Sequence, residues 1–277
     1  MAAVKEPNFF AYENHQVGDF GDKETQDHYN QSITNIDDYK ELFSEVKTES
    51  RIGEVSNTTM YMPHAIATIK KYLKQPKLIA ILRNPAERLV SRFMHLERVN
   101  KVPGITLEDV FDKSTIWWER PDLVNEGMYY KHLSKFYSSF HSGDIHVVLY
   151  DDLKRNVSNV LNDICHFLEV DSSYAFDTTV IYNKSGRVKN KTMQSLIGDN
   201  SKVINALKSA VPAIHSTLKK SKLLHSSVQR LRNQNLGNPD IDISYKSKII
   251  RDIYLDDIKA LESLLNRDLK LWYQSSE

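Results

Sequence analysis

The chain has a single cysteine among 277 residues, and this scarcity excludes an internal disulfide framework and any metal site built from several thiolates. Cys165 stands in the apolar run ICHFL, which predicts a buried thiol. Neither charge sign is in excess, because 37 Lys and Arg accompany 36 Asp and Glu for a net charge of +1. We therefore expect no general polyanion-binding or nucleic-acid-binding surface, and any basic site has to be local.

Long apolar runs are also missing from the sequence. None approaches the roughly 20 residues that a membrane-spanning helix needs, and the first seven residues, MAAVKEP, lack the apolar core of a signal peptide. We therefore expect a soluble, cytoplasmic protein with no membrane contact, unless a longer N-terminus carries an anchor. Repeats and low-complexity tracts are absent too, and the 40% of hydrophobic residues can build a substantial core.

Apolar periodicity predicts an alternation of strands and helices along the first two thirds of the chain. Continuous apolar runs predict buried strands at 77–82 and 144–150, and RIGEVS (51–56) fits a short strand. Helical spacing predicts helices over 36–46, 63–74, 85–99, 127–140 and 151–168. Residues 14–35 are polar and predict an irregular surface loop.

Only helical patterns follow residue 192, over 201–210, 213–232 and 244–265. The whole pattern predicts an α/β fold, with a parallel sheet, helical crossovers and a C-terminal helical layer on the same sheet. We expect one domain over residues 1–277.

The stretch KLIAILRNPAERLVSRFMH, residues 77–95, places an arginine where a buried strand ends. Arg83 would lie at the carboxyl end of that strand, where open α/β sheets bind ligands. Asn84 and Pro85 suit the cap and first turn of the next helix, whose start favours an anion. Ser91 follows two turns later, so Arg83 and Ser91 together could hold one phosphate.

Other polar residues on this helix have plainer interpretations. Arg88 shares a face with Ser91, yet Arg88 and Arg92 also fit solvated helix charges, and His95 fits a structural imidazole. Elsewhere, Trp117 and Trp118 could line an acceptor pocket or simply pack in the core.

LRNPAERLVSRFMH resembles the 3′-phosphate-binding motif of sulfotransferases that use 3′-phosphoadenosine 5′-phosphosulfate (PAPS), above all the heparan-sulfate and bacterial carbohydrate branch. Further segments resemble this family in the family's order: KEPNFF (5–10), GEVSNTTMY (53–61), EGMYYKHLSKF (126–136), HVVLYDDLKRNVSNVLNDICHFLEV (146–170), YNKSGRVKNK (182–191) and LLNRDLKLW (264–272). The likeness covers almost the whole chain, and the ordered set is more specific than any single motif. It implies a P-loop-NTPase-like three-layer sandwich and transfer of a sulfuryl group from PAPS to a hydroxyl acceptor, a carbohydrate or a small molecule.

The resemblance also implies roles for individual residues. Arg83 and Ser91 would grip the 3′-phosphate of the nucleotide, and the loop with Ser185, Gly186 and Arg187 would cover it. Glu6 would be the base, because sulfuryl transfer to an alcohol is an in-line displacement in which the acceptor hydroxyl loses a proton. Asn8 stands where many relatives have histidine, so it would only position the acceptor. No metal is implied.

From residue chemistry alone, two of these segments have ordinary alternatives. Lys5 and Glu6 fit a surface charge pair, and residues 184–187 fit an exposed basic turn.

The sequence departs from the family in two places. Val55 stands where heparan-type enzymes often have lysine, which points away from a strict heparan-sulfate enzyme. The family's Lys-x-Gly-Thr loop, which wraps the 5′-phosphosulfate, is not found in the sequence. By resemblance it should precede Glu6 by roughly twenty-odd residues, and its lysine would neutralise the leaving oxygen. We therefore expect an N-terminally truncated sulfotransferase that binds the nucleotide weakly and transfers sulfate poorly.

Two other functions compete with sulfuryl transfer. A nucleotide kinase would need a Gly-x-x-x-x-Gly-Lys-Ser/Thr loop and a metal-binding aspartate after a strand, and the sequence offers neither. A degenerate or truncated nucleotide-binding protein without catalysis fits the missing loop. The acceptor and the oligomeric state stay open.

Overall fold

The computed structural model describes residues 2–19, 23–99, 101–178, 237 and 243–274 of the chain. The predicted helices at 201–210 and 213–232 lie outside these residues. So does the loop with Ser185, Gly186 and Arg187.

The described residues form helices around two strands, and the bounds are as follows. The first half contains α1 (Phe9–Tyr12), α2 (Lys23–Asn30), α3 (Ile36–Glu41), α4 (Ala65–Tyr72), β1 (Leu78–Leu82), α5 (Pro85–Arg98), α6 (Leu107–Phe111) and α7 (Ile116–Glu119). The second half contains α8 (Tyr129–Tyr137), β2 (Ile145–Leu149), α9 (Tyr150–Arg155), α10 (Val157–Leu168), α15 (Ile243–Ile249), the π-helix η5 (Ile250–Tyr254) and α16 (Leu255–Leu265). Short 3₁₀ helices are η1 (Val17–Asp19), η2 (Asn57–Met60), η3 (Asn125–Gly127), η4 (Ser142–Asp144) and η6 (Lys270–Trp272).

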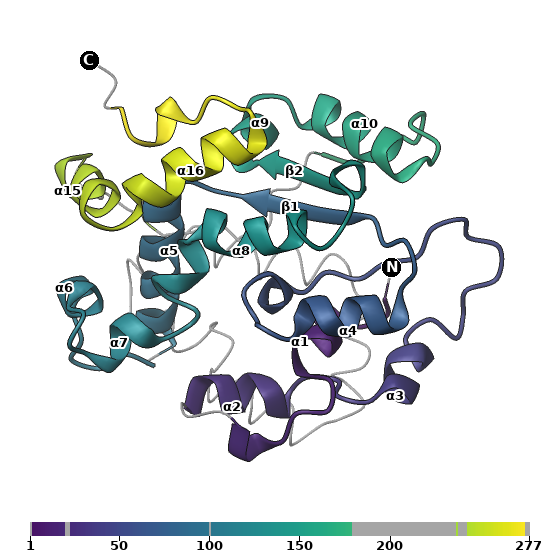
Figure 1. Cartoon of the computed structure of the whole chain (residues 1–277), viewed down its shortest axis with the longest axis horizontal. Helices are drawn as coiled ribbons and strands as arrows, with labels where there is room; N and C mark the ends of the chain where they lie inside the picture. The colour runs from purple at the N-terminus through teal and green to yellow at the C-terminus, as the bar shows by residue number, and fades with distance from the viewer. Residues whose placement is uncertain (1, 20–22, 100, 179–236, 238–242, 275–277) are drawn as a thin grey trace.

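The two strands lie side by side and run parallel, from the pair Leu78↔Ile145 to the pair Leu82↔Leu149. The chain between them forms α5 to α8, the helical crossover that a parallel pair requires. In Figure 1, α9 and α10 lie above the strands, whereas α4 and α1 lie below them. The predicted α/β fold with a parallel sheet is confirmed.

The C-terminal helices form the predicted helical layer, and they pack on helices of the crossover. α16 lies along α8, and η5 and α15 contact α5. Their buried residues Ile249, Ile250, Tyr254, Ile258 and Leu261 join the larger of two apolar clusters. Leu82, Leu89 and Val124 belong to the same cluster, which therefore binds β1, α5 and the segment before α8 into one core.

Two sequence predictions are wrong. Residues 51–56 form no strand; Ile52 and Val55 are exposed, and Gly53 and Val55 accept backbone hydrogen bonds only from Ala2 and Glu6 at the N-terminus. The predicted loop at 14–35 contains the helix α2, although that helix has no apolar stripe. Contacts outside the segment hold α2 in place, such as the edge-on rings of Tyr12 and Tyr29.

Cys165 is buried, as predicted. Within the described part of the chain, no helix has the length and apolarity that crossing a membrane requires.

Candidate functional site

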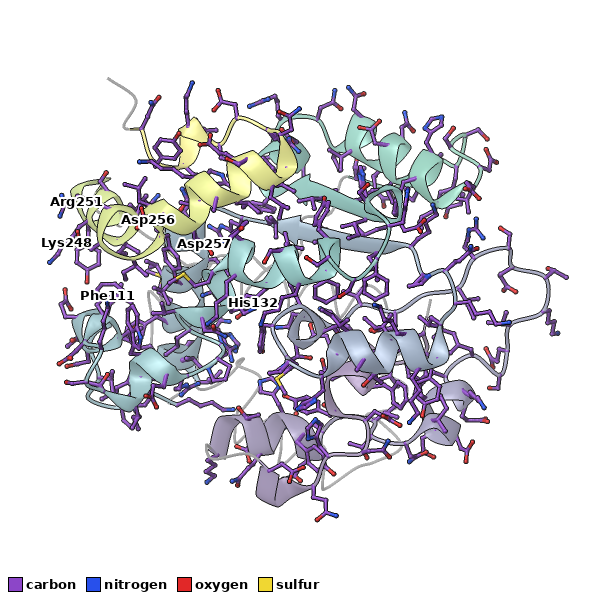
Figure 2. The ribbon with its side chains drawn as sticks, viewed as in Figure 1. Phe111, His132, Lys248, Arg251, Asp256 and Asp257 are labelled. Atoms are coloured by element: carbon purple, nitrogen blue, oxygen red, sulfur yellow. The ribbon has the colours of Figure 1, made fainter. Side chains whose placement is uncertain are left out.

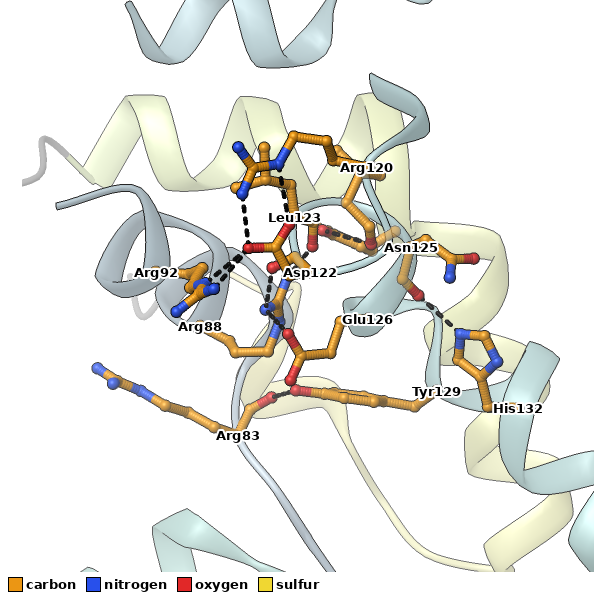
Figure 3. A network of polar contacts seen from close by, with 12 residues as sticks. Arg83, Arg88, Arg92, Arg120, Asp122, Leu123, Asn125, Glu126, Tyr129 and His132 are labelled. Carbon is orange, nitrogen blue, oxygen red and sulfur yellow. Dashed lines mark hydrogen bonds and ion pairs between the residues drawn. The ribbon is translucent and has the colours of Figure 1, made fainter. Parts of the chain in front are cut away.

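The carboxyl ends of β1 and β2 meet at one edge of the sheet, and the predicted arginine lies there. Because Leu82 pairs with Leu149, the next residues, Arg83 and Tyr150, leave the sheet together. The guanidinium carbon of Arg83 lies 5.5 Å from the centre of the Tyr150 ring. The backbone carbonyl of Arg83 accepts a hydrogen bond of 2.9 Å from the buried hydroxyl of Tyr129 (Figure 3). The backbone of Arg83, where the chain leaves β1, is therefore held by Tyr129.

Asn84 caps α5 as predicted, with Pro85 at the first helical position. Its Oδ1 accepts from the backbone N–H groups of Ala86 at 3.1 Å and Glu87 at 3.2 Å. These two donors are therefore engaged by the cap. A ligand at this helix start would depend mainly on side chains, which corrects the expectation that the backbone groups themselves attract the anion.

Trp272 connects the two strand ends. Its carbonyl accepts from Asn84 Nδ2 at 3.2 Å, and its indole N–H donates to Asp151 Oδ2 at 2.8 Å. Asn84 follows β1 and Asp151 follows β2, so one tryptophan near the C-terminus holds both turns at this edge of the sheet.

The side chain of Arg83 lies over the first turns of α5. Its Nη2 and Nε donate to Glu87 Oε2 at 3.0 and 3.2 Å, and 29% of the side chain is exposed. Burial raises the pKa of Glu87, but the hydrogen bond from Arg83 and the charge of Lys246 together outweigh burial. The pKa of Glu87 therefore lies below its usual value. The carboxylate is therefore ionised at neutral pH.

Ser91 lies one helical turn beyond Glu87 and is half-buried. Residues four apart share a face of a helix, with their Cβ atoms about 6 Å from each other. Arg83 binds Glu87, so its guanidinium lies over the face of α5 to which Ser91 belongs by its spacing. Their joint binding of a phosphate stays a prediction.

The interpretation of Arg88 and Arg92 as solvated charges is wrong, because both enter a buried network (Figure 3). Arg88 Nη1 donates to Glu126 Oε2 at 2.8 Å and its Nη2 donates to the carbonyl of Leu123. Arg92 binds Asp122 Oδ2 with bonds of 2.6 and 2.9 Å. The network attaches α5 to residues 122–126 rather than offering cations to a ligand.

Asp122 is the centre of this network, since Arg120 binds it as well, at 2.9 and 3.0 Å. Burial raises the pKa of Asp122, but the bonds and charges of Arg120 and Arg92 outweigh it and hold the pKa below its usual value. Burial has the stronger effect at Glu126, whose pKa lies above the usual value despite Arg88 and Arg92. Two carboxylates and three guanidiniums thus share one desolvated cluster.

The predicted base, Glu6, lies in an irregular segment next to residues 53–58. Its backbone N–H donates to the carbonyl of Val55 at 3.2 Å, and its side chain is 43% exposed, with Oε1 at 3.9 Å from Lys5 Nζ. Glu6 and Asn8 both have left-handed backbone angles, with φ of 55° and 54°. The carboxylate is accessible to a substrate, whereas its backbone is held.

Asn8 helps to fix the backbone of Glu6. It is only 5% exposed; its Nδ2 donates to the carbonyl of Glu6 at 2.9 Å, and its Oδ1 accepts from Thr58 Oγ1 at 2.7 Å. Its N–H donates to Ser56 Oγ at 2.9 Å, and that hydroxyl donates to Glu54. Glu6 forms hydrogen bonds with Val55 and Asn8, whereas Arg83 binds Glu87. The described contacts therefore define two separate groups of candidate site residues.

Trp117, Trp118 and His95 make contacts that stabilise the fold. Trp117 and Trp118 are partly buried against the main core, beside the cations of Arg120 and Lys113 respectively. His95 Nδ1 lies 2.8 Å from Arg98 Nη2 on the same helix. Sequence reasoning missed Glu87 and Lys246; the spacing of Arg83 and Glu87, four residues apart, was the available signal for the first.

Comparisons with known proteins place these groups in a wider context. A family model described as "Sulfotransferase domain" matches residues 8–238. The bifunctional heparan sulfate N-deacetylase/N-sulfotransferase 1 of Caenorhabditis elegans is 28% identical over 137 residues, which cover 48% of this chain and 16% of that protein. The crystal structure of a sulfotransferase from Alicyclobacillus acidocaldarius has a TM-score of 0.68 at 18% identity, covering 99% of this chain and 87% of that one. This last likeness shows a shared P-loop-like fold.

Proposed function

Because the chain belongs to the sulfotransferase domain family, we propose that it transfers a sulfuryl group from PAPS to a hydroxyl group of a carbohydrate. The observation that carries the nucleotide half of this proposal is the position of Arg83 at the carboxyl ends of two parallel strands. The carbohydrate half is supported by the similarity to a heparan sulfate N-sulfotransferase, as that relative is named.

Arg83 and Ser91 bind the 3′-phosphate in this proposal. A guanidinium has five N–H donors, and the two contacts with Glu87 leave others for a phosphate on its exposed side. Charge-assisted bonds of this kind are the strong ones, and arginine suits phosphate geometry. The loop with Ser185, Gly186 and Arg187 adds further nucleotide contacts.

Glu6 acts as the base in this proposal. As the acceptor oxygen forms its bond to sulfur, its proton moves to the Glu6 carboxylate, and the bond between sulfur and the 5′-phosphate oxygen breaks. Asn8 is too buried to be an open contact surface, so we assign it an indirect role: it positions the acceptor by holding the backbone of Glu6.

Calorimetric titration tests the nucleotide site. The unmodified chain should bind 3′-phosphoadenosine 5′-phosphate more tightly than adenosine 5′-phosphate, because only the former carries the 3′-phosphate. Arg83→Ala should weaken the first nucleotide by roughly 10- to 100-fold, the loss of one or two charge-assisted bonds, and leave the second unchanged. Arg155→Ala is the matched control, because that arginine is exposed. Equal affinities for both nucleotides would contradict the proposal.

A transfer assay with PAPS and a panel of polysaccharides tests the chemistry. Glu6→Gln should abolish transfer and keep nucleotide affinity, since the amide cannot accept the proton. Nucleotide binding by the unmodified chain without transfer to any hydroxyl acceptor would instead favour a binding protein without catalysis.

A further inference from the structure

A second cation reaches the Arg83 group from the C-terminal part of the chain. Lys246 lies on α15, and its Nζ is 3.3 Å from Glu87 Oε1, while Arg83 occupies Glu87 Oε2. Each oxygen of one carboxylate thus contacts a different cation. The two cations come from segments about 160 residues apart, which the fold brings to the same turn of α5.

This trio carries more positive than negative charge. Glu87 can neutralise one of the two cations, so the trio itself carries a net charge of +1, next to the ion pair of Asp151 with Lys154. The three side chains are 29%, 34% and 26% exposed for Arg83, Lys246 and Glu87, so the group is open to a ligand on one side. A surplus cation in a half-desolvated position favours an incoming anion.

The helix that carries Lys246 has a fixed place. The neighbouring Tyr245 donates its hydroxyl to Glu108 on α6 at 2.7 Å, and Ile249 and Ile250 are buried in the core. Lysine itself is a point charge on a four-carbon stem, which can turn from Glu87 to a nearby phosphate oxygen without moving the helix.

We propose that Lys246 is a further contact for the 3′-phosphate of the nucleotide, so that the C-terminal helix layer completes the site begun by Arg83 and Ser91. This inference rests on the proposed function. A phosphate monoester carries about −1.5 to −2 charges at neutral pH, more than one guanidinium balances next to a carboxylate. Lys246 supplies the second positive charge from the side of α15.

The same helix offers a matched control. Lys248 lies two residues further on, about 200° around the helix axis from Lys246, and it is exposed. Figure 2 shows Lys248 and Arg251 at the outer edge of the molecule, on the side of Phe111. Replacing Lys248 removes the same charge from the same helix without touching Glu87.

The experiment compares two nucleotides by calorimetry at low salt. Lys246→Met should weaken 3′-phosphoadenosine 5′-phosphate about tenfold, the size of one charge-assisted contact, and leave adenosine 5′-phosphate unchanged. Lys246→Arg should retain most of the affinity, and Lys248→Met should change neither nucleotide. Thermal melting of each variant verifies that the fold is intact.

A Glu87→Gln background separates direct contact from an indirect effect. If Lys246 only masks the charge of Glu87, Lys246→Met has no effect once Glu87 is neutral, and the inference is overturned; a persisting loss supports it. Unchanged binding by Lys246→Met, or an equal loss for both nucleotides, overturns it as well. If Arg83→Ala nevertheless weakens binding of 3′-phosphoadenosine 5′-phosphate and leaves adenosine 5′-phosphate unchanged, the proposed function survives. If the unmodified chain does not prefer the 3′-phosphorylated nucleotide, both fail.

Discussion

Replacing Asp122 by asparagine should destabilise the protein more than any ordinary surface change. The Asp122 side chain is 10% exposed and accepts four hydrogen bonds, two from Arg92 and two from Arg120. An amide of the same size turns an NH₂ group toward one guanidinium and leaves two buried cations without their counter-charge. The variant tests whether the network in Figure 3 supports the fold.

The magnitude follows from the burial of that charge. Removing one partner of a buried ion pair costs about 3–5 kcal/mol, because the remaining charge is left uncompensated. For a chain of this size each kcal/mol lowers the melting temperature by about 2–4 °C, so the expected decrease is roughly 6–20 °C. The pKa of Asp122 is lowered in the folded state, so its contribution is present above the unfolded value, near 4, and is lost as the pH falls through the folded value.

Thermal unfolding at pH 7 measures the effect, and the difference between Asp122→Asn and the unmodified chain should shrink below about pH 4. Asp112→Asn is the matched control: that carboxylate is exposed and only accepts from Ser114. The reasoning is refuted if Asp122→Asn melts within about 2 °C of the unmodified chain, or if Asp112→Asn loses as much stability.

Two further changes address the strand exit and the pH response. Tyr129→Phe should cost about 1 kcal/mol in urea unfolding, because the carbonyl of Arg83 loses its donor, whereas the exposed Tyr130→Phe should cost little; equal losses would contradict this. Burial lowers the pKa of His132, so the fold favours its neutral form and stability should fall as the pH drops below about 6.5. His132→Gln should flatten the change in melting temperature between pH 7.5 and 5.5, and the exposed His166→Gln should not; a slope unchanged by His132→Gln would count against the explanation.

The sequence predicts best where neighbours along the chain decide the outcome. The apolar run before Arg83 is long enough for a strand and too short for a helix, and the structure has β1 there. The strand is not buried on both faces as predicted, because Ile79 and Ile81 are exposed. Asn84 and Pro85 are a local start signal for a helix, and α5 begins at Pro85. The place of Arg83 at the end of a strand was therefore predictable from residues 77–95.

The partners of the charged residues were not predictable, because they come from distant segments. Arg88 and Arg92 fit solvated charges in the sequence, yet their carboxylates, Glu126 and Asp122, lie 38 and 30 residues later. Periodicity states which face of a helix is polar, but only the tertiary fold determines what that face meets. Lys246, at 159 residues from Glu87, is the extreme case.

The bonds of Trp272 have a practical consequence for anyone preparing this protein. One residue near the carboxyl terminus joins the turns after β1 and β2 through Asn84 and Asp151. Changes to Trp272 would therefore act on the turn that carries Arg83, the proposed nucleotide contact. A residue far from Arg83 along the chain thus helps to hold the backbone beside it.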